Sequence, residues 1–408
     1  MLAVASPEDA LKMIDEHFGA IRTAAEELPI YDAYGRVLAE DIHSREDVPA
    51  FDRSTMDGYA VNASDTFGAS ETLMAMLKPV GTVHMGETPD FTIGKGECAY
   101  IPTGGRLPEG SNGVVMVEYT EDFGDGYIYA QSSIAPGANV IYRGDDVKEG
   151  ALLLKTGTVI RPQEMGALAA MGYPKVKVFQ RLKVGILSTG DELVDVDAPQ
   201  TGSVVRDVNT YALSAGLCAI GAEPVRYGIT KDDHASLTAA LHKALSECDA
   251  VLISGGSSVG TADMTHRIID EAGKPGVFLH GVAVKPGKPT IAGDINGKPV
   301  FGLPGHPVSA YFIYRIFVAP VFQKMMGQLT EQRREIAATM SRNVPSNHGR
   351  QEYIPVSLTV GEDGSTLAAP VATKSGLITT LCRADGFVCI KRDAEGLRRG
   401  EAVTVILF

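Results

Sequence analysis

The first stretch of the chain has the hydrophobic spacing of an amphipathic helix. Apolar residues recur every three or four positions, at Leu11, Ile14, Phe18 and Ile21. Ser6 is a good N-cap residue and Pro7 is tolerated in a first helical turn. The pattern therefore predicts a helix that begins at residue 7.

The pattern changes between residues 29 and 179 and changes again after residue 181. The first zone contains short β-branched runs broken by Gly and Pro, which predicts strands, with one helix near 163–171. The next zone, to about residue 327, alternates strands at 184–187, 225–229 and 250–253 with helices. One helix is expected at 208–220, and another, capped by Asp232 or Asp233, carries Leu237, Leu241 and Leu245. Strands joined by helices favour a parallel sheet that binds ligands at its carboxyl edge.

The last 75 or so residues, which follow a polar linker at 330–335, alternate in the manner of a small β-barrel. The predicted fold class is thus α/β plus β, in several domains. Residues 1–180 form a mixed N-terminal region with an inserted β-rich part at about 48–140. Residues 181–327 form an α/β domain with a mostly parallel sheet, and residues 328–408 form the C-terminal barrel.

Charge and composition narrow the class of ligand. The chain has 408 residues, 37 of them basic and 50 acidic, for a net charge of −13, which argues against non-specific nucleic-acid binding. The longest apolar stretch, 310–325, is interrupted by charged residues and proline and is too short for the roughly 20 residues that span a bilayer. Five scattered cysteines without a C-x-x-C pair, and no signal peptide at the first residues, predict a cytoplasmic protein.

Three apolar segments run directly into turns of Gly, Pro, Ser and Lys, at 251–260, 284–289 and 301–309. Backbone that turns sharply at a strand end and leaves N–H groups free can hold phosphate or another oxyanion. None of the turns is a G-x-G-x-x-G fingerprint, and residues 293–298 are one residue short of a Walker A motif. The turns therefore predict one composite anion site that is neither a Rossmann nor a P-loop site.

Charged residues accompany these turns. Lys285 and Lys288 flank a Pro-Gly turn that suits a dianion, whereas solvated lysines are the plainer interpretation. Asp263 follows the Gly-Gly-Ser-Ser turn, where it would either hold Mg²⁺ between itself and a phosphate or cap a helix starting at residue 264. Glu192 and Asp232 also follow predicted strands, so all five residues are expected at the ligand-binding edge.

Two polar segments interrupt the N-terminal zone. Residues 51–61 contain Asp52, Arg53, Ser54 and Asp57 between hydrophobic neighbours, and residues 100–105 end in a hydroxyl and two glycines. A β core needs neither segment, which favours a binding role.

Together these residues resemble the molybdopterin molybdenumtransferases of the bacterial MoeA type, and the chain is also similar to the E domain of gephyrin. The resemblance lies in residues 52–60, 103–105, 143–146, 162–166, 188–193, 254–263, 285–289 and 302–310. It implies an elongated homodimer in which Asp57 and Thr103 of one subunit face the α/β domain of the other. His306 stands where the family pattern has Asn, which leaves the choice between molybdate and tungstate open.

The resemblance also implies the reaction and the residues that carry it. Adenylylated molybdopterin and molybdate are the substrates, Mg²⁺ is the cofactor, and AMP is released as molybdenum joins the pterin dithiolene. Catalytic roles are implied for Asp57, Asp263, Lys285 and Lys288, with Asp57 aligning a nucleophilic oxygen or water. The implied metal ligands are Glu192, Asp232 and Asp263. The implied substrate-binding residues are Thr103, Ser188, Gly255, Gly256, Ser257, Ser258, Pro304, Gly305, His306, Arg350 and Ser375.

Two other functions stay open from the sequence. One is the preceding step, adenylylation of molybdopterin by ATP, which would not require the Asp57 and Thr103 segments. The other is a non-catalytic dimeric scaffold of the gephyrin kind, which would not require the polar site residues. A molybdopterin adenylyltransferase and molybdoenzyme maturation proteins are the expected partners, with no nucleic acid and no membrane.

Overall fold

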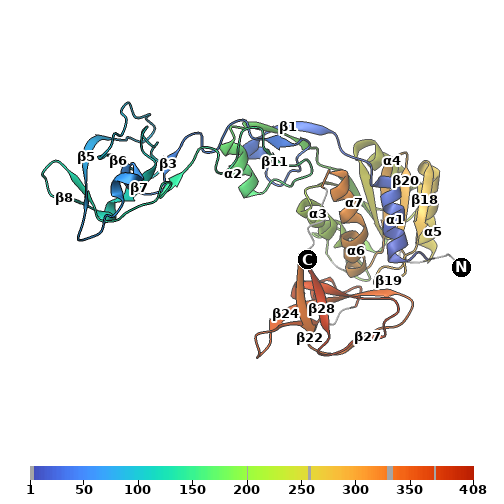
Figure 1. The fold of residues 1–408 in the computed structure, drawn as a ribbon. Coiled ribbons are helices and arrows are strands. Elements are labelled where there is room, and N and C mark those ends of the chain that lie inside the picture. The colour runs from blue at the N-terminus through green and yellow to red at the C-terminus, as the bar shows by residue number, and fades with distance from the viewer. Residues whose placement is uncertain (1–3, 200, 256–258, 329–333, 372–373) are drawn as a thin grey trace.

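The computed structural model describes residues 4–199, 201–255, 259–328, 334–371 and 374–408 (Figure 1). The molecule is elongated. A β-rich part lies at one end, a small connecting part follows, and the α/β domain with the C-terminal barrel beside it lies at the other end. The predicted site segments of the β-rich part therefore lie far from the predicted site residues of the α/β domain within one chain.

The first helix, α1 (Pro7–Phe18), begins where its sequence predicts. The Ser6 hydroxyl accepts a hydrogen bond from the Asp9 N–H at 3.0 Å, and the helix buries Ile14 and Phe18. These side chains belong to the core of the α/β domain, and α1 lies beside that domain in Figure 1. The start of the chain therefore packs on a domain whose strands come more than 160 residues later.

The connecting part is built from two antiparallel strand pairs and one helix. Strand β1 (Ala25–Pro29) pairs with β12 (Lys175–Phe179), β2 (Ile42–His43) pairs with β11 (Leu152–Leu154), and α2 (Pro162–Ala170) covers them. A short 3-10 helix, η1 (Ile30–Asp32), follows β1. The core of the connecting part includes Leu38, Ile160 and Leu168, and each of these side chains is fully buried.

The β-rich part is a six-stranded sheet in the order β7-β4-β6-β5-β9-β8, inserted between β2 and β11. Its strands are β4 (Gly58–Val61), β5 (Ala75–Thr82), β6 (Glu97–Ile101), β7 (Gly113–Met116), β8 (Thr120–Asp122) and β9 (Ile128–Ala130). Two short 3-10 helices, η2 (Ala63–Thr66) and η3 (Val117–Tyr119), and the pair β3 (Arg53–Ser54) with β10 (Val140–Ile141) complete it. Separate apolar clusters pack on the sheet, one around Val61 and Leu77 and one around Ala60 and Ile101.

The α/β domain has six strands in the order β16-β13-β17-β21-β20-β18, and its sheet is mostly parallel as predicted. The strands are β13 (Lys183–Thr189), β16 (Glu223–Thr230), β17 (Ala250–Gly255), β18 (Pro275–His280), β20 (Ile291–Ile295) and β21 (Lys298–Leu303), of which β20 is antiparallel to both its neighbours. A small parallel pair, β14 (Leu193–Val194) with β15 (Val205–Arg206), follows β13.

Helices cover both faces of this sheet. One face packs on α1, α3 (Asn209–Ala219), α6 (Pro307–Ile313) and α7 (Ala319–Met325), and the other packs on α4 (His234–Glu247) and α5 (Val259–Ala272). A π-helical turn, η4 (Tyr314–Val318), joins α6 to α7, so the apolar stretch at 310–325 is a folded layer of this domain. No helix among the described residues is long and apolar enough to cross a membrane. The Asp233 carboxylate caps α4 by accepting the Ser236 N–H at 2.9 Å, which leaves Asp232 for another role.

The C-terminal part is a closed five-stranded barrel, as predicted. Its strands are β22 (Glu335–Met340), β24 (Gln351–Val360), β25 (Thr366–Pro370), β26 (Gly386–Ile390) and β28 (Ala402–Leu407), and β24 pairs with β26 to close it. The short pair β23 (Val344–Pro345) with β27 (Gly396–Leu397) and the 3-10 helix η5 (Ile378–Arg383) lie outside the ring. Strand β19 (Val284–Lys285), from the α/β region, pairs in parallel with β24.

That pairing corrects one prediction about the lysine turn. Residues 285–289 were expected at a strand end of the α/β sheet, but β19 is hydrogen-bonded to the barrel strand β24 instead. The turn therefore lies between the two domains, because the strand before it extends the barrel sheet rather than the parallel one.

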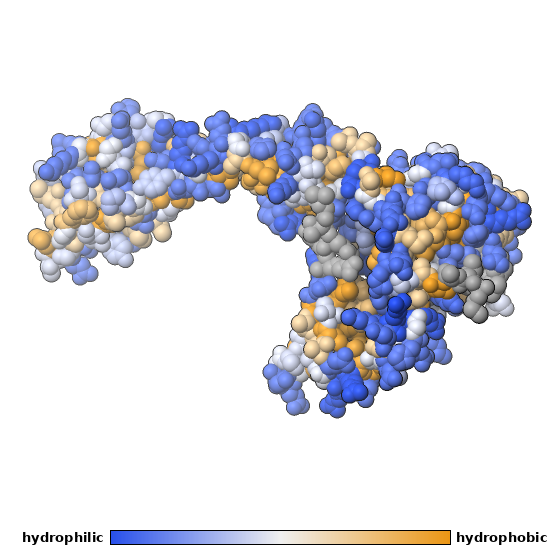
Figure 2. Space-filling view, turned by 45° about the vertical axis from the view of Figure 1, so that its right-hand side comes forward, coloured by the Kyte–Doolittle hydropathy of each residue, from blue (hydrophilic) through white to orange (hydrophobic). Residues whose placement is uncertain are grey.

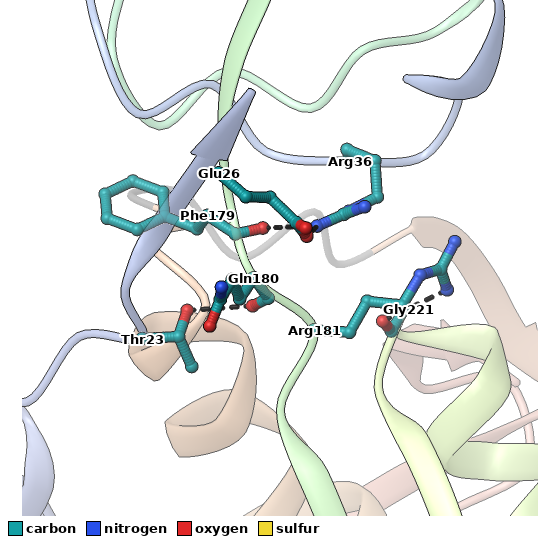
Figure 3. Close-up of polar contacts among 7 residues, drawn as sticks. All are labelled: Thr23, Glu26, Arg36, Phe179, Gln180, Arg181 and Gly221. Carbon is teal, nitrogen blue, oxygen red and sulfur yellow. Dashed lines mark hydrogen bonds and ion pairs between the residues drawn. The ribbon is translucent and has the colours of Figure 1, made fainter. Parts of the chain in front are cut away.

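Two chain segments connect the α/β domain to the connecting part, and polar contacts fasten them together (Figure 3). Thr23 donates its hydroxyl to the Gln180 carbonyl at 2.8 Å and its N–H to the Met325 carbonyl at 2.9 Å. Arg36 donates to the Phe179 carbonyl at 2.8 Å and pairs with Glu26. The bonds of Thr23 thus tie one connecting segment to the other and to the end of α7 in the α/β domain.

Candidate functional site

Two adjoining pockets contain most of the predicted site residues. The first, a cavity of about 690 Å³, lies between the α/β domain and the barrel and is rich in basic side chains. The second, about 650 Å³, lies at the carboxyl edge of the parallel strands and contains acidic side chains. We call them the basic pocket and the acidic pocket. His306 lines both, so the two pockets meet at this residue.

The basic pocket brings together residues that are far apart in sequence. Its predicted members are Lys285, Lys288, Pro304, His306, Arg350 and Ser375. Because β19 pairs with β24, Lys285 lies opposite Glu352 on the barrel, and its ammonium nitrogen is 2.6 Å from the Glu352 Oε1. Glu352 is 7% exposed and also accepts the Ser346 hydroxyl at 2.7 Å. Lys288 is exposed and forms no ion pair with any residue in the described part of the chain.

Three further side chains of the basic pocket were not predicted. Arg342 and Lys374 add positive charge, and Glu352 fixes Lys285. No sequence signal marks them, because they lie on barrel strands and loops that approach the turn only in the folded chain. The four cationic side chains Lys288, Arg342, Arg350 and Lys374 around one cavity favour a multivalent anion.

The acidic pocket is formed by the ends of three parallel strands and the start of α3 and α6. Thr189 ends β13 and Gly190 follows it, Gly255 ends β17, and Gly305 precedes α6. Gly255 has φ +141°, and a Cβ built there would lie 2.1 Å from the Thr189 carbonyl oxygen. Only glycine allows these two strands to come this close at the pocket.

Glu192 and Asp232 line the acidic pocket together. Asp232 accepts the Thr189 hydroxyl at 3.2 Å, while burial and the neighbouring charges of Asp191, Glu192 and Asp233 raise its pKa. A carboxylate that is crowded by like charges is stabilised by a bound cation. Across the described ranges, however, no group of three or more His, Cys, Asp or Glu side chains is arranged to hold a metal ion.

Asp263 does not have the helix-capping position that one of the two sequence interpretations gave it. It lies inside α5, which begins at Val259, so it does not cap a helix that starts at residue 264. It is exposed and is not among the described residues that line the acidic pocket, although its charge acts on His280. The set of Glu192, Asp232 and Asp263 is therefore divided in this structure, with two carboxylates in the pocket and one on the helix.

The remaining predictions near β13 and β17 have mixed outcomes. Ser188 is fully buried, and its hydroxyl lies 2.9 Å from that of Thr210, so the pocket is lined by the next residue, Thr189. Gly256, Ser257 and Ser258 lie outside the described residues. Alternation along a strand explains the Ser188 result, because adjacent side chains point to opposite faces.

Asn209 is a pocket residue that the sequence did not reveal. It is 8% exposed, and its side-chain amide donates to the Ser254 hydroxyl at 2.7 Å and to the Gly305 carbonyl at 2.8 Å. Its Oδ1 atom is buried without a hydrogen-bond partner. Buried acceptors are usually paired, so an unpaired one in the pocket wall is unusual.

Asp57 and Thr103 form a separate pair in the β-rich part. The N–H and the hydroxyl of Thr103 both donate to the Asp57 Oδ1, at 2.6 and 2.9 Å, and they lower the pKa of Asp57. Figure 1 shows this part at the end of the molecule opposite the α/β domain, and Figure 2 shows open space between it and the barrel. Within one chain, therefore, this pair does not meet the two pockets.

Sequence and structure comparisons agree along nearly the whole chain. Residues 5–172 match the MoeA N-terminal region, 185–324 match a probable molybdopterin binding domain, and 337–408 match the MoeA C-terminal region. A molybdopterin molybdenumtransferase of Haemophilus influenzae is 32% identical over 388 residues, covering 95% of this chain and 94% of the relative. A putative molybdopterin biosynthesis protein of Methanocaldococcus jannaschii is 36% identical over 391 residues, covering 94% and 92%.

Solved structures give the same result. A molybdopterin biosynthesis MoeA protein from Pyrococcus horikoshii OT3 superposes with a TM-score of 0.85 at 33% identity, and the match covers 100% of both chains. An N-terminal MoeA region, a molybdopterin-binding domain and a C-terminal MoeA region, in this order, define the class of MoeA-type molybdopterin biosynthesis proteins. The chain belongs to the MoeA family, whose curated relatives include transferases named molybdopterin molybdenumtransferase.

Proposed function

We propose that this protein is a molybdopterin molybdenumtransferase that inserts molybdate into adenylylated molybdopterin and releases AMP with the help of Mg²⁺. The single observation that carries the proposal is the meeting of the two pockets at His306. The reaction needs a tetrahedral dianion beside a pterin nucleotide, and these two pockets suit one ligand each.

The basic pocket suits molybdate. Lys288 and Arg350 are exposed to the cavity, and neither is neutralised by an ion pair within the described chain. Charge-assisted hydrogen bonds from such groups hold oxyanions strongly. Lys285, which Glu352 orients, adds a third cationic group whose charge is partly balanced.

The acidic pocket suits the pterin nucleotide. Free backbone N–H groups at strand ends bind phosphate oxygens, and the unpaired Asn209 Oδ1 can accept an N–H group of the pterin. Glu192 and Asp232 fit Mg²⁺, which needs only one or two carboxylates when phosphate oxygens complete its shell. When bound, Mg²⁺ would offset the negative charge that develops as the adenylyl phosphate bond breaks. We assign Asp263 no ligand role on the present geometry.

Asp57 acts, in this proposal, from the partner subunit of a homodimer. The Thr103 bonds that lower its pKa keep it ionised, and a carboxylate with a low pKa is a weak base. This favours orientation of a substrate oxygen over proton removal. We place the reaction in the cytoplasm, with a molybdopterin adenylyltransferase as the supplier of substrate and molybdoenzyme maturation proteins as recipients.

The test of activity is AMP release. Purified protein is incubated with adenylylated molybdopterin, molybdate and MgCl₂, and AMP is quantified against a reaction without protein. Release that requires molybdate supports the proposal. No release above the control contradicts it, and ATP consumption with molybdopterin alone would instead support the adenylyltransferase.

A mixing experiment tests the shared site. At a limiting molybdate concentration, Asp57→Asn and Lys288→Gln are each expected to lose most of the activity. Co-expressed chains form mixed dimers that contain one intact site. If dimers form at random, activity returns to about a quarter of the wild-type level. A site within one chain predicts no recovery, because every chain then carries one defect. A chain with both substitutions, co-expressed with the Lys288→Gln chain, is the matched control and recovers nothing.

A further inference from the structure

A third cavity, of about 520 Å³, lies where the connecting part, the α/β domain and the barrel meet. It shares no described lining residue with the basic or the acidic pocket. Its walls include Tyr34, Gly216, Arg181, Tyr314, Arg315 and Arg334. We call it the junction cavity.

Positive charge dominates the junction cavity. Three guanidinium groups, those of Arg181, Arg315 and Arg334, line it, and its described lining includes no Asp or Glu side chain. Arg181 donates to the Gly221 carbonyl at 3.3 Å (Figure 3), and Arg315 donates to the Leu407 carbonyl at 3.2 Å. Each guanidinium has five N–H donors, so most remain available. Phe408 also lines the cavity, and a terminal carboxylate there would offset only one of the three charges.

Tyr314, which lines the same cavity, has a buried hydroxyl without a partner. Tyr314 is 1% exposed, its ring packs against Gly216, and its hydroxyl makes no hydrogen bond. A buried hydroxyl without a hydrogen-bond partner lowers the stability of the fold, and a ligand that pairs with it would remove this cost. Tyr314 also begins the π-helical turn that contains Arg315. Such turns occur frequently at functional sites.

We propose that the junction cavity binds a small polyanion of the phosphate or polycarboxylate class. Planar guanidinium forks match both groups, the Tyr314 hydroxyl supplies one more donor, and the volume suits a small molecule. Because the walls come from three parts of the chain, the ligand would hold these parts in one arrangement. The inference does not depend on the proposed reaction.

Binding to full-length protein tests the proposal by titration calorimetry. Inorganic pyrophosphate and citrate are the two probes, and comparing them shows whether the cavity prefers a phosphate or a polycarboxylate ligand. All titrations use a Lys288→Gln/Arg350→Gln background, which weakens binding in the basic pocket. One probe or both should bind with a single site per chain.

Two sets of variants locate that site. Arg181→Gln/Arg334→Gln changes two exposed side chains and should weaken binding by about a hundredfold, roughly tenfold for each lost charge-assisted contact. Arg392→Gln/Arg399→Gln removes two exposed barrel charges outside the cavity and should leave binding unchanged.

Tyr314→Phe separates a ligand contact from a structural role. Because the hydroxyl has no partner, the unliganded variant should be at least as stable to heat as the parent, yet it should bind the probe several-fold more weakly. Absence of binding in the background variant overturns the proposal. Equal losses in the two arginine double variants overturn it as well, and so does Tyr314→Phe with unchanged affinity.

Discussion

Two lysines of one turn are predicted to differ in what they do, because only one of them has a carboxylate partner. Lys285 lies 2.6 Å from Glu352, whose side chain is 9% exposed, whereas Lys288 is exposed and has no ion pair among the residues described. Lys288→Gln should therefore weaken molybdate binding without a loss of stability. Lys285→Gln should reduce both, because it leaves the Glu352 carboxylate without its counter-charge.

The expected changes in molybdate affinity and in unfolding free energy follow from the exposure and ion pairing of each lysine. A charge-assisted hydrogen bond is worth about 1.5–3 kcal/mol, so loss of Lys288 should raise the dissociation constant for molybdate about 10- to 100-fold. Its effect on unfolding should stay within about 0.5 kcal/mol. Breaking a buried ion pair costs about 3–5 kcal/mol, but Lys285 is 49% exposed and Glu352 keeps its Ser346 bond. Solvent screening reduces the expected loss to about 1–2 kcal/mol.

Calorimetry with molybdate and urea unfolding followed by circular dichroism give the two quantities, since the chain has no tryptophan to report by fluorescence. Glu352→Gln provides the control, because adding it to Lys285→Gln removes the unpaired carboxylate and should restore part of the lost stability. Equal unfolding free energies for the two lysine variants would refute the reasoning. So would a Lys288→Gln protein that binds molybdate as tightly as the wild type.

Three further predictions concern the acidic pocket and the residue between the pockets. The raised pKa of Asp232 means that its ionisation costs stability, and that cost appears as the pH rises through the folded-state pKa. Without metal, Asp232→Asn should therefore unfold at a higher temperature than the wild type at neutral pH, and MgCl₂ should stabilise only the wild type. His306 lines both pockets, so His306→Asn should change the ratio of the affinities for molybdate and tungstate, measured by calorimetry with each oxyanion. Gly255→Ala should destabilise by about 1–3 kcal/mol in urea, because its Cβ would meet the Thr189 carbonyl, whereas Gly166→Ala, which has open space around it, should not.

Much of the local structure was predictable because it depends on neighbours in sequence. Ser6 caps α1, the leucine spacing marks α4, and the alternation of strands and helices gives the mostly parallel sheet. Gly255 also lies at the predicted strand end, since a tight approach between strands requires glycine there. These features are determined by periodicity, capping and backbone freedom, which a short window of sequence records.

The arrangement of the site residues depends on long-range contacts, which a short stretch of sequence does not reveal. The sequence could place Lys285 at a strand end but not on the barrel, because the pairing of β19 with β24 joins residues more than 60 positions apart. It also grouped Asp263 with Glu192 and Asp232, whereas the helix start at Val259 puts Asp263 on the α5 surface.

What the sequence determined by itself was the order of elements, the fold class and the chemical kinds of residue at the strand ends. What only the tertiary structure decided was which of these residues share a pocket and that Asn209 carries an unpaired acceptor. It also decided that the β-rich part, which contains Asp57, lies at the end of the molecule opposite the α/β domain. The physical reason is that local propensities act over one or two turns of chain. A binding pocket, by contrast, is made by burial and strand pairing between segments that lie far apart in the sequence, as β19 and β24 do.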